Sequence, residues 1–218
     1  MGRTVSTDEY LDRILAKFAG SFDIIKDYSI SLPSTGELTY AAYGYFCSLS
    51  EKYVLTKKAN LWTTVQYEHV LFIRTEECTE ELIDQVYTVM KEYIEPVLVR
   101  EGGKYPHRDH MESLMTAVFI CEKKPSEAVV KRIRRFRFGK SYLFTVRGRA
   151  EGRAVEVDME SEEVVYSPRA RGMKKAFDTA FDEIRKGVRG YEELYAGADG
   201  AEDAAAGEES SAEGPAEN

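Results

Sequence analysis

The spacing of apolar residues along the chain predicts a succession of helices and strands. Apolar residues at every third or fourth position predict a helix over residues 7–19, and Ser6 and Glu9 form a capping box at its start. Stretches rich in aromatic and β-branched residues then predict four strands, which cover residues 22–30, 38–48, 53–59 and 65–75. The short connections between these strands favour antiparallel pairing.

The second half of the chain alternates between helical and extended patterns. A helix begins after Thr79, and Pro96 predicts a kink or an end of that helix. The apolar run over residues 115–121 predicts a buried strand, and a helix follows Ser126. The remaining predicted elements are a hairpin of strands 142–149 and 153–159 around a turn at 150–152, a short strand at 164–166 and an amphipathic helix over 173–188.

These elements together predict an α+β fold. We expect a mainly antiparallel (mixed) sheet flanked by about four helices, in a single domain over residues 1–190. Residues 191–218 carry nine acidic residues and no basic residue, and residues 196–218 hold no Val, Ile, Leu, Met or aromatic side chain. Such a segment has too little apolar surface to offset the entropy of ordering, so we predict that residues 191–218 are an acidic disordered tail.

Two stretches resemble each other at a spacing of 47 residues. Residues 70–73 align with residues 117–120, and Thr79 aligns with Ser126. Each copy reads as a strand, a polar turn and a capped helix. One interpretation is a duplicated half-domain with pseudo-twofold architecture, and the other is that any strand–turn–helix unit shows this pattern.

The apolar runs and the cysteines indicate the cellular compartment of the protein. The longest apolar runs are about eight residues, well below the roughly 20 needed to span a bilayer, so we expect no membrane partner. Cys47, Cys78 and Cys121 are odd in number and widely spaced, which argues against a disulfide framework and against a zinc site built from thiolates. We therefore expect a cytoplasmic protein that needs no cofactor.

Charge is distributed unevenly and points to the main candidate site. Residues 123–190 carry a net charge of +8, whereas residues 1–122 carry −7 and residues 191–218 carry −9. Guanidinium groups bind phosphates and carboxylates in a bidentate way, and neighbouring aromatic faces can stack on bases. The candidate ligand-binding residues are Arg134, Arg135, Arg137, Arg147, Arg149 and Arg153.

This basic C-terminal face has two interpretations. The first is a non-enzymatic binding or regulatory protein that engages an anionic partner, either a protein or a nucleic acid, with the acidic tail competing for the same face. The second is a solvated helix face, in which Phe136 and Phe138 point into the core and the arginines pair with Glu156, Asp158 and the acidic N-terminal half of the chain.

Three other groups of residues carry weaker functional hypotheses. Asp109, Glu122 and Lys124 suggest a metal-dependent phosphodiesterase or nuclease-like enzyme, because acids can hold Mg²⁺ while a lysine supports the attacking water. Residues 107–112 contain two histidines and two carboxylates, which form either a metal site or a polar loop. The remaining alternative is a purely structural or oligomeric module. Trp62 and the tyrosines Tyr40, Tyr43, Tyr45 and Tyr53 either line a ligand cleft or pack a sheet face.

Several short motifs are spread over most of the chain. They are Glu9-Tyr10-Leu11, Phe22-Asp23-Ile24, Glu51-Lys52-Tyr53-Val54-Leu55, Lys57-Lys58-Ala59, Tyr67-Glu68, His110-Met111, Lys140-Ser141 and Arg147-Gly148. Together these motifs resemble an uncharacterised family of small cytoplasmic bacterial proteins that contain a domain of unknown function. The resemblance covers residues 7–175 and leaves out the tail. It implies no activity, but it supports a bacterial cytoplasmic setting.

Overall fold

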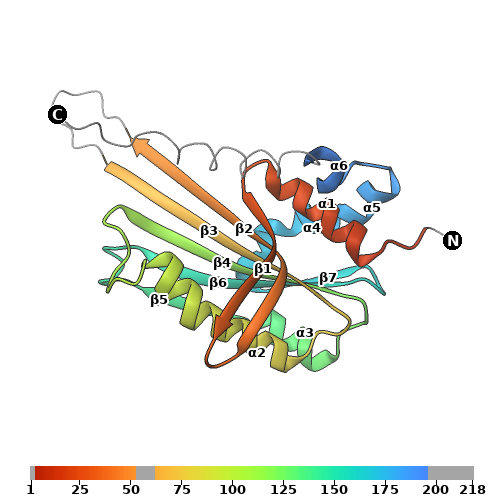
Figure 1. The fold of residues 1–218 in the computed structure, drawn as a ribbon, viewed down its shortest axis with the longest axis horizontal. Helices are drawn as coiled ribbons and strands as arrows, with labels where there is room; N and C mark the ends of the chain where they lie inside the picture. Colours follow the sequence, from red (N-terminus) through yellow and green to blue (C-terminus); the bar gives the residue numbers. More distant parts are fainter. Residues whose placement is uncertain (1–2, 53–61, 196–218) are drawn as a thin grey trace, which may run out of the picture.

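A computed structural model describes residues 3–52 and 62–195, which form a seven-stranded mixed sheet with helices on both faces (Figure 1). The predicted strand at 53–59 lies outside these residues. The strands are β1 (Asp23–Leu32), β2 (Gly36–Lys52), β3 (Trp62–Thr75), β4 (His110–Cys121), β5 (Phe138–Ser141), β6 (Arg149–Asp158) and β7 (Glu163–Tyr166). The helices are α1 (Thr7–Ala19), α2 (Glu80–Val89), the π-helix η1 (Met90–Val99), α3 (Glu127–Arg134), the 3₁₀-helix η2 (Pro168–Met173), α4 (Lys174–Asp178), α5 (Ala180–Arg185) and α6 (Tyr191–Tyr195).

The sheet combines an antiparallel meander with a parallel centre. Its strand order is β1-β2-β3-β4-β6-β5, and β7 pairs with the far half of β6. Strands β1, β2 and β3 pair antiparallel as predicted, whereas β3, β4 and β6 run parallel to one another. The parallel strands therefore all begin at the same edge of the sheet, which we call the strand-start edge. The α+β prediction with a mainly antiparallel mixed sheet is confirmed.

Each face of the sheet has its own apolar core. On one face, Leu71, Ala117 and Ala154 pack under α2, η1 and α3. On the other face, Phe72, Val118 and Val155 pack under α1, α4 and α5. Successive side chains on a strand point to opposite faces, so the alternating buried residues of β3 and β4 fill both cores. Figure 1 shows β2 and β3 extending past these helices toward the strand-start edge.

Local capping signals place three helix starts where the sequence predicts them. Ser6 and Glu9 form the capping box of α1, and the side chains of Thr79 and Ser126 accept the amides three residues on. The two strand–turn–helix units are therefore real, and they lie side by side because β3 and β4 are parallel neighbours. Parallel strands with both helices on one face are related by a shift along the sheet, so the pseudo-twofold interpretation is wrong.

The predicted hairpin around residues 150–152 is wrong. Residues 150–152 lie inside β6, which runs from Arg149 to Asp158 and pairs in parallel with β4. The antiparallel partner of its first half is β5, which the sequence pattern did not separate from the preceding helix. Residues 142–148 form the connecting turn instead of a strand.

Two predicted helices also differ in detail. Pro96 does not end the second helix, because the chain continues as the π-helix η1 to Val99. The last helix is broken into α4 and α5. The ammonium group of Lys17 donates to the carbonyl of Ala176, the acceptor that an unbroken α-helix would offer to the amide of Ala180.

The folded part of the chain extends past residue 190. Residues 191–195, which were predicted to belong to the tail, form α6, and Tyr191 is buried against the core under α1. The predictions for residues 196–218 lie outside the described part of the chain. Within the described part, no helix combines the length and the apolar character that crossing a bilayer requires.

Candidate functional site

The C-terminal end of α3 carries a compact group of exposed cations. Lys131, Arg134 and Arg135 follow one another at spacings that place them side by side on the helix, and Arg137 follows two residues later. All four side chains are exposed, and none makes an ion pair with a residue that the structure describes. We call these four residues the α3 cation cluster. Their charges are therefore available to a partner.

The other predicted arginines are engaged within the fold. Arg149 pairs with Glu112 at 2.7 Å and with Glu151 at 3.4 Å. Arg153 is 9% exposed, pairs with Glu68 and donates to Thr116 Oγ1 at 2.8 Å. Both arginines lie on the sheet face opposite α3, because they alternate with Ala150 and Ala154 along β6. The structure thus separates them from Arg134, Arg135 and Arg137.

Arg147 contributes to neither group. Its side chain is half-buried and donates to the carbonyl of Pro106 at 3.5 Å. Its backbone is engaged as well, because its carbonyl accepts from His110 Nδ1. Arg147 therefore helps to hold the loops at the strand-start edge together.

The aromatic residues between the arginines face the core. Phe136 is 1% exposed, and both Phe136 and Phe138 pack edge-on against Tyr87 of α2. Their faces are therefore not available to stack on nucleic-acid bases. The α3 cation cluster can recognise charge, but it lacks the stacking platform that the sequence suggested.

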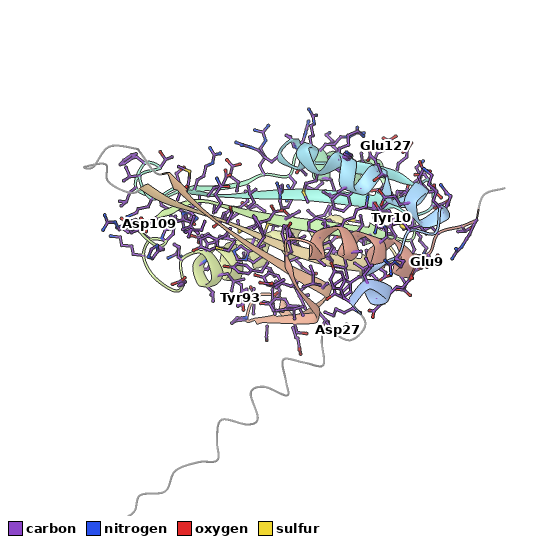
Figure 2. The ribbon with its side chains drawn as sticks, turned by 90° about the horizontal axis from the view of Figure 1, so that it is seen from above. Glu9, Tyr10, Asp27, Tyr93, Asp109 and Glu127 are labelled. Carbon is purple, nitrogen blue, oxygen red and sulfur yellow. The ribbon has the colours of Figure 1, made fainter. Side chains whose placement is uncertain are left out.

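An open pocket of about 830 Å³ lies at the strand-start edge. Figure 2 shows Asp109 at this end of the molecule, far from Glu9 and Tyr10 at the other end. The first residues of β3, β4 and β6 form its floor, and the loop before β4 and the turn before β6 form its rim. The lining residues are Thr64, Gln66, Arg108, Asp109, His110, Met111, Glu112, Thr145, Val146, Gly148 and Arg149.

His110 holds the rim of this pocket in place. It is buried, its Nδ1 lies 2.9 Å from the carbonyl oxygen of Arg147, and its Nε2 lies 2.8 Å from Ser113 Oγ. The carbonyl can only accept, so Nδ1 carries the proton and Nε2 accepts from Ser113. Burial lowers the pKa of His110, which favours this neutral form. With both nitrogens engaged, His110 acts as a structural anchor of the turn at 142–148.

Three of the four predicted tyrosines pack against the sheet, whereas Tyr53 and the side chain of Trp62 lie outside the described part of the chain. Tyr40 and Tyr43 are buried in the α2 and α3 core, and the Tyr43 hydroxyl lies 2.7 Å from Nδ1 of the buried His69. Burial lowers the pKa of His69 to about 4, so the imidazole is neutral near pH 7. Tyr45 stacks on Tyr67 in the same layer. This is the sheet-packing interpretation rather than a ligand cleft.

The residues of the phosphodiesterase hypothesis are far apart. Asp109 directly precedes β4 and Glu122 directly follows it. A strand of twelve residues at about 3.3 Å per residue separates the two carboxylates by roughly 40 Å. They cannot share one metal ion, and Lys124 lies with Glu122 at the wrong end.

The histidines and carboxylates at residues 107–112 are also divided among different contacts. His107 faces Asp109 at 3.8 Å, whereas His110 and Glu112 point to Ser113 and Arg149. Across the described residues, no group of three or more His, Cys, Asp or Glu side chains is arranged to hold a metal ion.

A second polar cluster is buried where the parallel strands end. Glu156 is 0% exposed, and neither carboxylate oxygen has a hydrogen-bond partner among the described residues. The weakly donating thiol of Cys121 lies beside it, and burial together with Asp158 raises the pKa of Glu156 to about 8. Contact with Cys78 and burial raise the pKa of Cys121. The neutral thiol of Cys121 and a neutral acid therefore share this site at pH 7.

The pocket and the turn were missed by sequence reasoning. Residues 142–149 carry the alternation typical of a strand, and only Gly148 hinted at a turn. The sequence does contain one signal for the pocket: His110, Arg147 and Gly148 lie close to the ends of two predicted strands.

Comparison with known proteins gives a family but no activity. The family model described as "Domain of unknown function (DUF8052)" matches residues 6–179. No curated protein matches the chain, and no solved structure matches it.

Proposed function

Since the chain belongs to the family of domains of unknown function DUF8052, we propose from its surface chemistry that it is a non-enzymatic binding protein for an acidic polypeptide, held by the α3 cation cluster. The observation that carries the proposal is the group of three exposed guanidinium groups at Arg134, Arg135 and Arg137, which make no ion pair within the described part of the chain. Guanidinium groups bind carboxylates strongly and in a defined geometry.

The contrast with neighbouring cations supports this choice of surface. Arg132 pairs with Asp84 across the α2–α3 contact, and Lys140 pairs with the buried Glu95 at 2.9 Å. Structural roles account for these two cations, whereas the α3 cation cluster has no such role. An acidic polypeptide fits better than a nucleic acid because Phe136 and Phe138 are packed into the core.

Charge reversal of the cluster is expected to weaken binding of an acidic polypeptide. The triple variant Arg134→Glu, Arg135→Glu, Arg137→Glu should lose at least about tenfold in affinity for poly-glutamate at low salt, which corresponds to about 1.4 kcal/mol. The side chains are exposed, so the fold should persist. Fluorescence anisotropy of labelled poly-glutamate across a salt series measures the effect.

A matched control separates the site from net charge. Arg171, Lys175 and Lys186 are exposed and make no ion pair with described residues, and they lie on η2, α4 and the end of α5. Their triple replacement by glutamate changes the net charge equally and should reduce affinity by no more than about twofold. Equal losses in the two triple variants would contradict the proposal. Tighter binding of a single-stranded oligonucleotide than of poly-glutamate at the same salt would reassign the partner to a nucleic acid.

Removal of the acidic C-terminal segment is expected to strengthen binding. Residues 196–218 contain seven acidic residues and no basic residue, so they compete with any acidic partner for the same cations. A chain that ends at residue 195 should bind poly-glutamate more tightly than the full chain, and the gain should shrink as salt is added. Unchanged affinity at low salt would show that the segment does not compete.

We further propose that the protein acts in the bacterial cytoplasm. Cys47, Cys78 and Cys121 are free thiols, which suits a reducing compartment. Fractionation of the producing cells would test this placement.

A further inference from the structure

The two most exposed of the large apolar side chains that the structure describes lie in the turn at the strand-start edge. Phe144 is 98% exposed and Val146 is 78% exposed, values that are rare for side chains of this size. Leu143 in the same turn is 40% exposed, and Met111 is 47% exposed and lines the same pocket as Val146. The apolar set at this edge is Met111, Leu143, Phe144 and Val146.

The turn that carries Phe144 is held in a strained form. Leu143, Phe144 and Thr145 have φ angles of 48°, 52° and 71°, in the left-handed region that costs roughly 1–2 kcal/mol for each such residue. The turn is closed by hydrogen bonds from the Tyr142 amide to the Gly148 carbonyl at 3.0 Å and from the Arg147 amide to the Tyr142 carbonyl at 3.1 Å. Strain that exposes an aromatic ring does not stabilise the monomer, and such strain concentrates at functional sites.

The open pocket lies directly beside the protruding turn at residues 142–148. Thr145 and Val146 form the rim of the open pocket, so the Phe144 ring projects next to a cavity with an apolar wall from Met111 and Val146. The pocket also contains charges of both signs, with Arg108 and Asp109 adjacent on its rim. A twofold contact requires a patch that complements itself, with both a protrusion and a hollow and with both signs of charge.

We propose that two copies of this chain associate about a twofold axis at the strand-start edge, with the Phe144 ring of each copy in the pocket of the other. Arg108 of one copy then lies opposite Asp109 of its partner. An aromatic ring buried in a pocket is the typical anchor of such an interface. An anionic lipid surface fits less well, because Asp109 on the pocket rim would be repelled by it. This inference does not depend on the proposed function of the α3 cation cluster.

Sedimentation of the full chain over a range of concentrations tests the proposal. We expect a reversible dimer with a dissociation constant on the order of 10 µM, typical of a small interface. Phe144→Asp should raise that constant at least tenfold without lowering the melting temperature, because the ring is exposed in the single chain. Val188→Asp is the matched control, since Val188 is 43% exposed and follows α5, away from this edge, and it should leave association unchanged.

A charge-swap experiment tests the twofold geometry itself. Arg108→Asp alone and Asp109→Arg alone should each sediment as monomers at concentrations where the wild-type chain dimerises, because like charges then meet across the axis. An equimolar mixture of the two variants should restore the dimer. Failure of the mixture to associate would overturn the proposed contact. A wild-type chain that stays monomeric but binds vesicles of phosphatidylglycerol and phosphatidylcholine through Phe144 would assign the surface to a membrane instead.

Discussion

Replacement of Glu156 by glutamine is expected to stabilise the protein above neutral pH. Glu156 is fully buried without a hydrogen-bond partner in the described structure, and its pKa is raised to about 8 from an ordinary value of 4.5. Below pH 4.5 the carboxyl is protonated in both the folded and the unfolded chain. As the pH rises from 4.5 through about 8, only the unfolded chain releases the proton, so the folded state loses about 1.4 kcal/mol per pH unit.

The expected size of this effect is large for a single side chain. Between about pH 5 and pH 8 the wild-type protein should lose about 3 kcal/mol of unfolding free energy through Glu156, whereas a neutral glutamine of the same shape should lose none. The unpaired amide of the glutamine costs on the order of 1 kcal/mol at every pH. Urea unfolding of the two proteins across this pH range measures the difference.

Two comparisons keep the test specific to Glu156. His69 also titrates, because burial lowers its pKa to about 4, so its contribution is present above pH 6.5 and is lost as the pH falls toward 4. That loss is common to both proteins and cancels in their difference. Glu163→Gln on the exposed side of β7 is the matched control and should follow the wild-type curve. Parallel curves for the wild type and Glu156→Gln would show that Glu156 is not held neutral in the fold.

The burial of Glu156 is a feature that could not be predicted from the sequence alone. Interactions between residues that are close in the sequence could be predicted. The capping box of Ser6 and Glu9, for example, determines the start of α1 by itself. The burial of Glu156 depends instead on β6 lying beside β4, with Cys121 as its neighbour. Nothing in the sequence near residue 156 states which strand will be its partner, and only one of the two interpretations of the basic face gave this acid a partner, namely the arginines.

The strand-start edge shows the same limit for backbone conformation. Leu143, Phe144 and Thr145 favour extended structure, so a strand was the reasonable prediction for them. Contacts with distant residues override this preference, because His110 holds the Arg147 carbonyl and Tyr142 closes the turn from both sides. The exposure of the α3 cations could be predicted from the sequence, because it follows from the local pattern of a charged helix end. The ion pairs of Arg149 and Arg153 could not, because they depend on which strands are neighbours in the sheet.

Replacement of Gly148 by alanine is expected to remove about 3 kcal/mol of stability and to disorganise the turn that carries Phe144. Gly148 has a φ of 75°, which costs a non-glycine residue roughly 1–2 kcal/mol. A Cβ atom there would also lie 2.6 Å from the carbonyl carbon of Met111 and 2.7 Å from Nδ1 of His110. These contacts cannot be relieved by a flexible side-chain end, so backbone must move, at a further cost of about 1–3 kcal/mol.

A second glycine in the same conformation separates strain from contact. Gly102 has a φ of 74°, and a Cβ atom built there meets nothing within 4 Å. Gly102→Ala should therefore cost only about 1 kcal/mol, from backbone strain alone. The difference between the two variants in urea unfolding reports the close approach of Gly148 to β4. The close contact between Gly148 and β4 holds the turn in place beside the pocket. Gly148→Ala should therefore weaken self-association even at low denaturant, whereas Gly102→Ala should not. Equal destabilisation by the two substitutions would show that the turn at residues 142–148 does not pack closely against Met111.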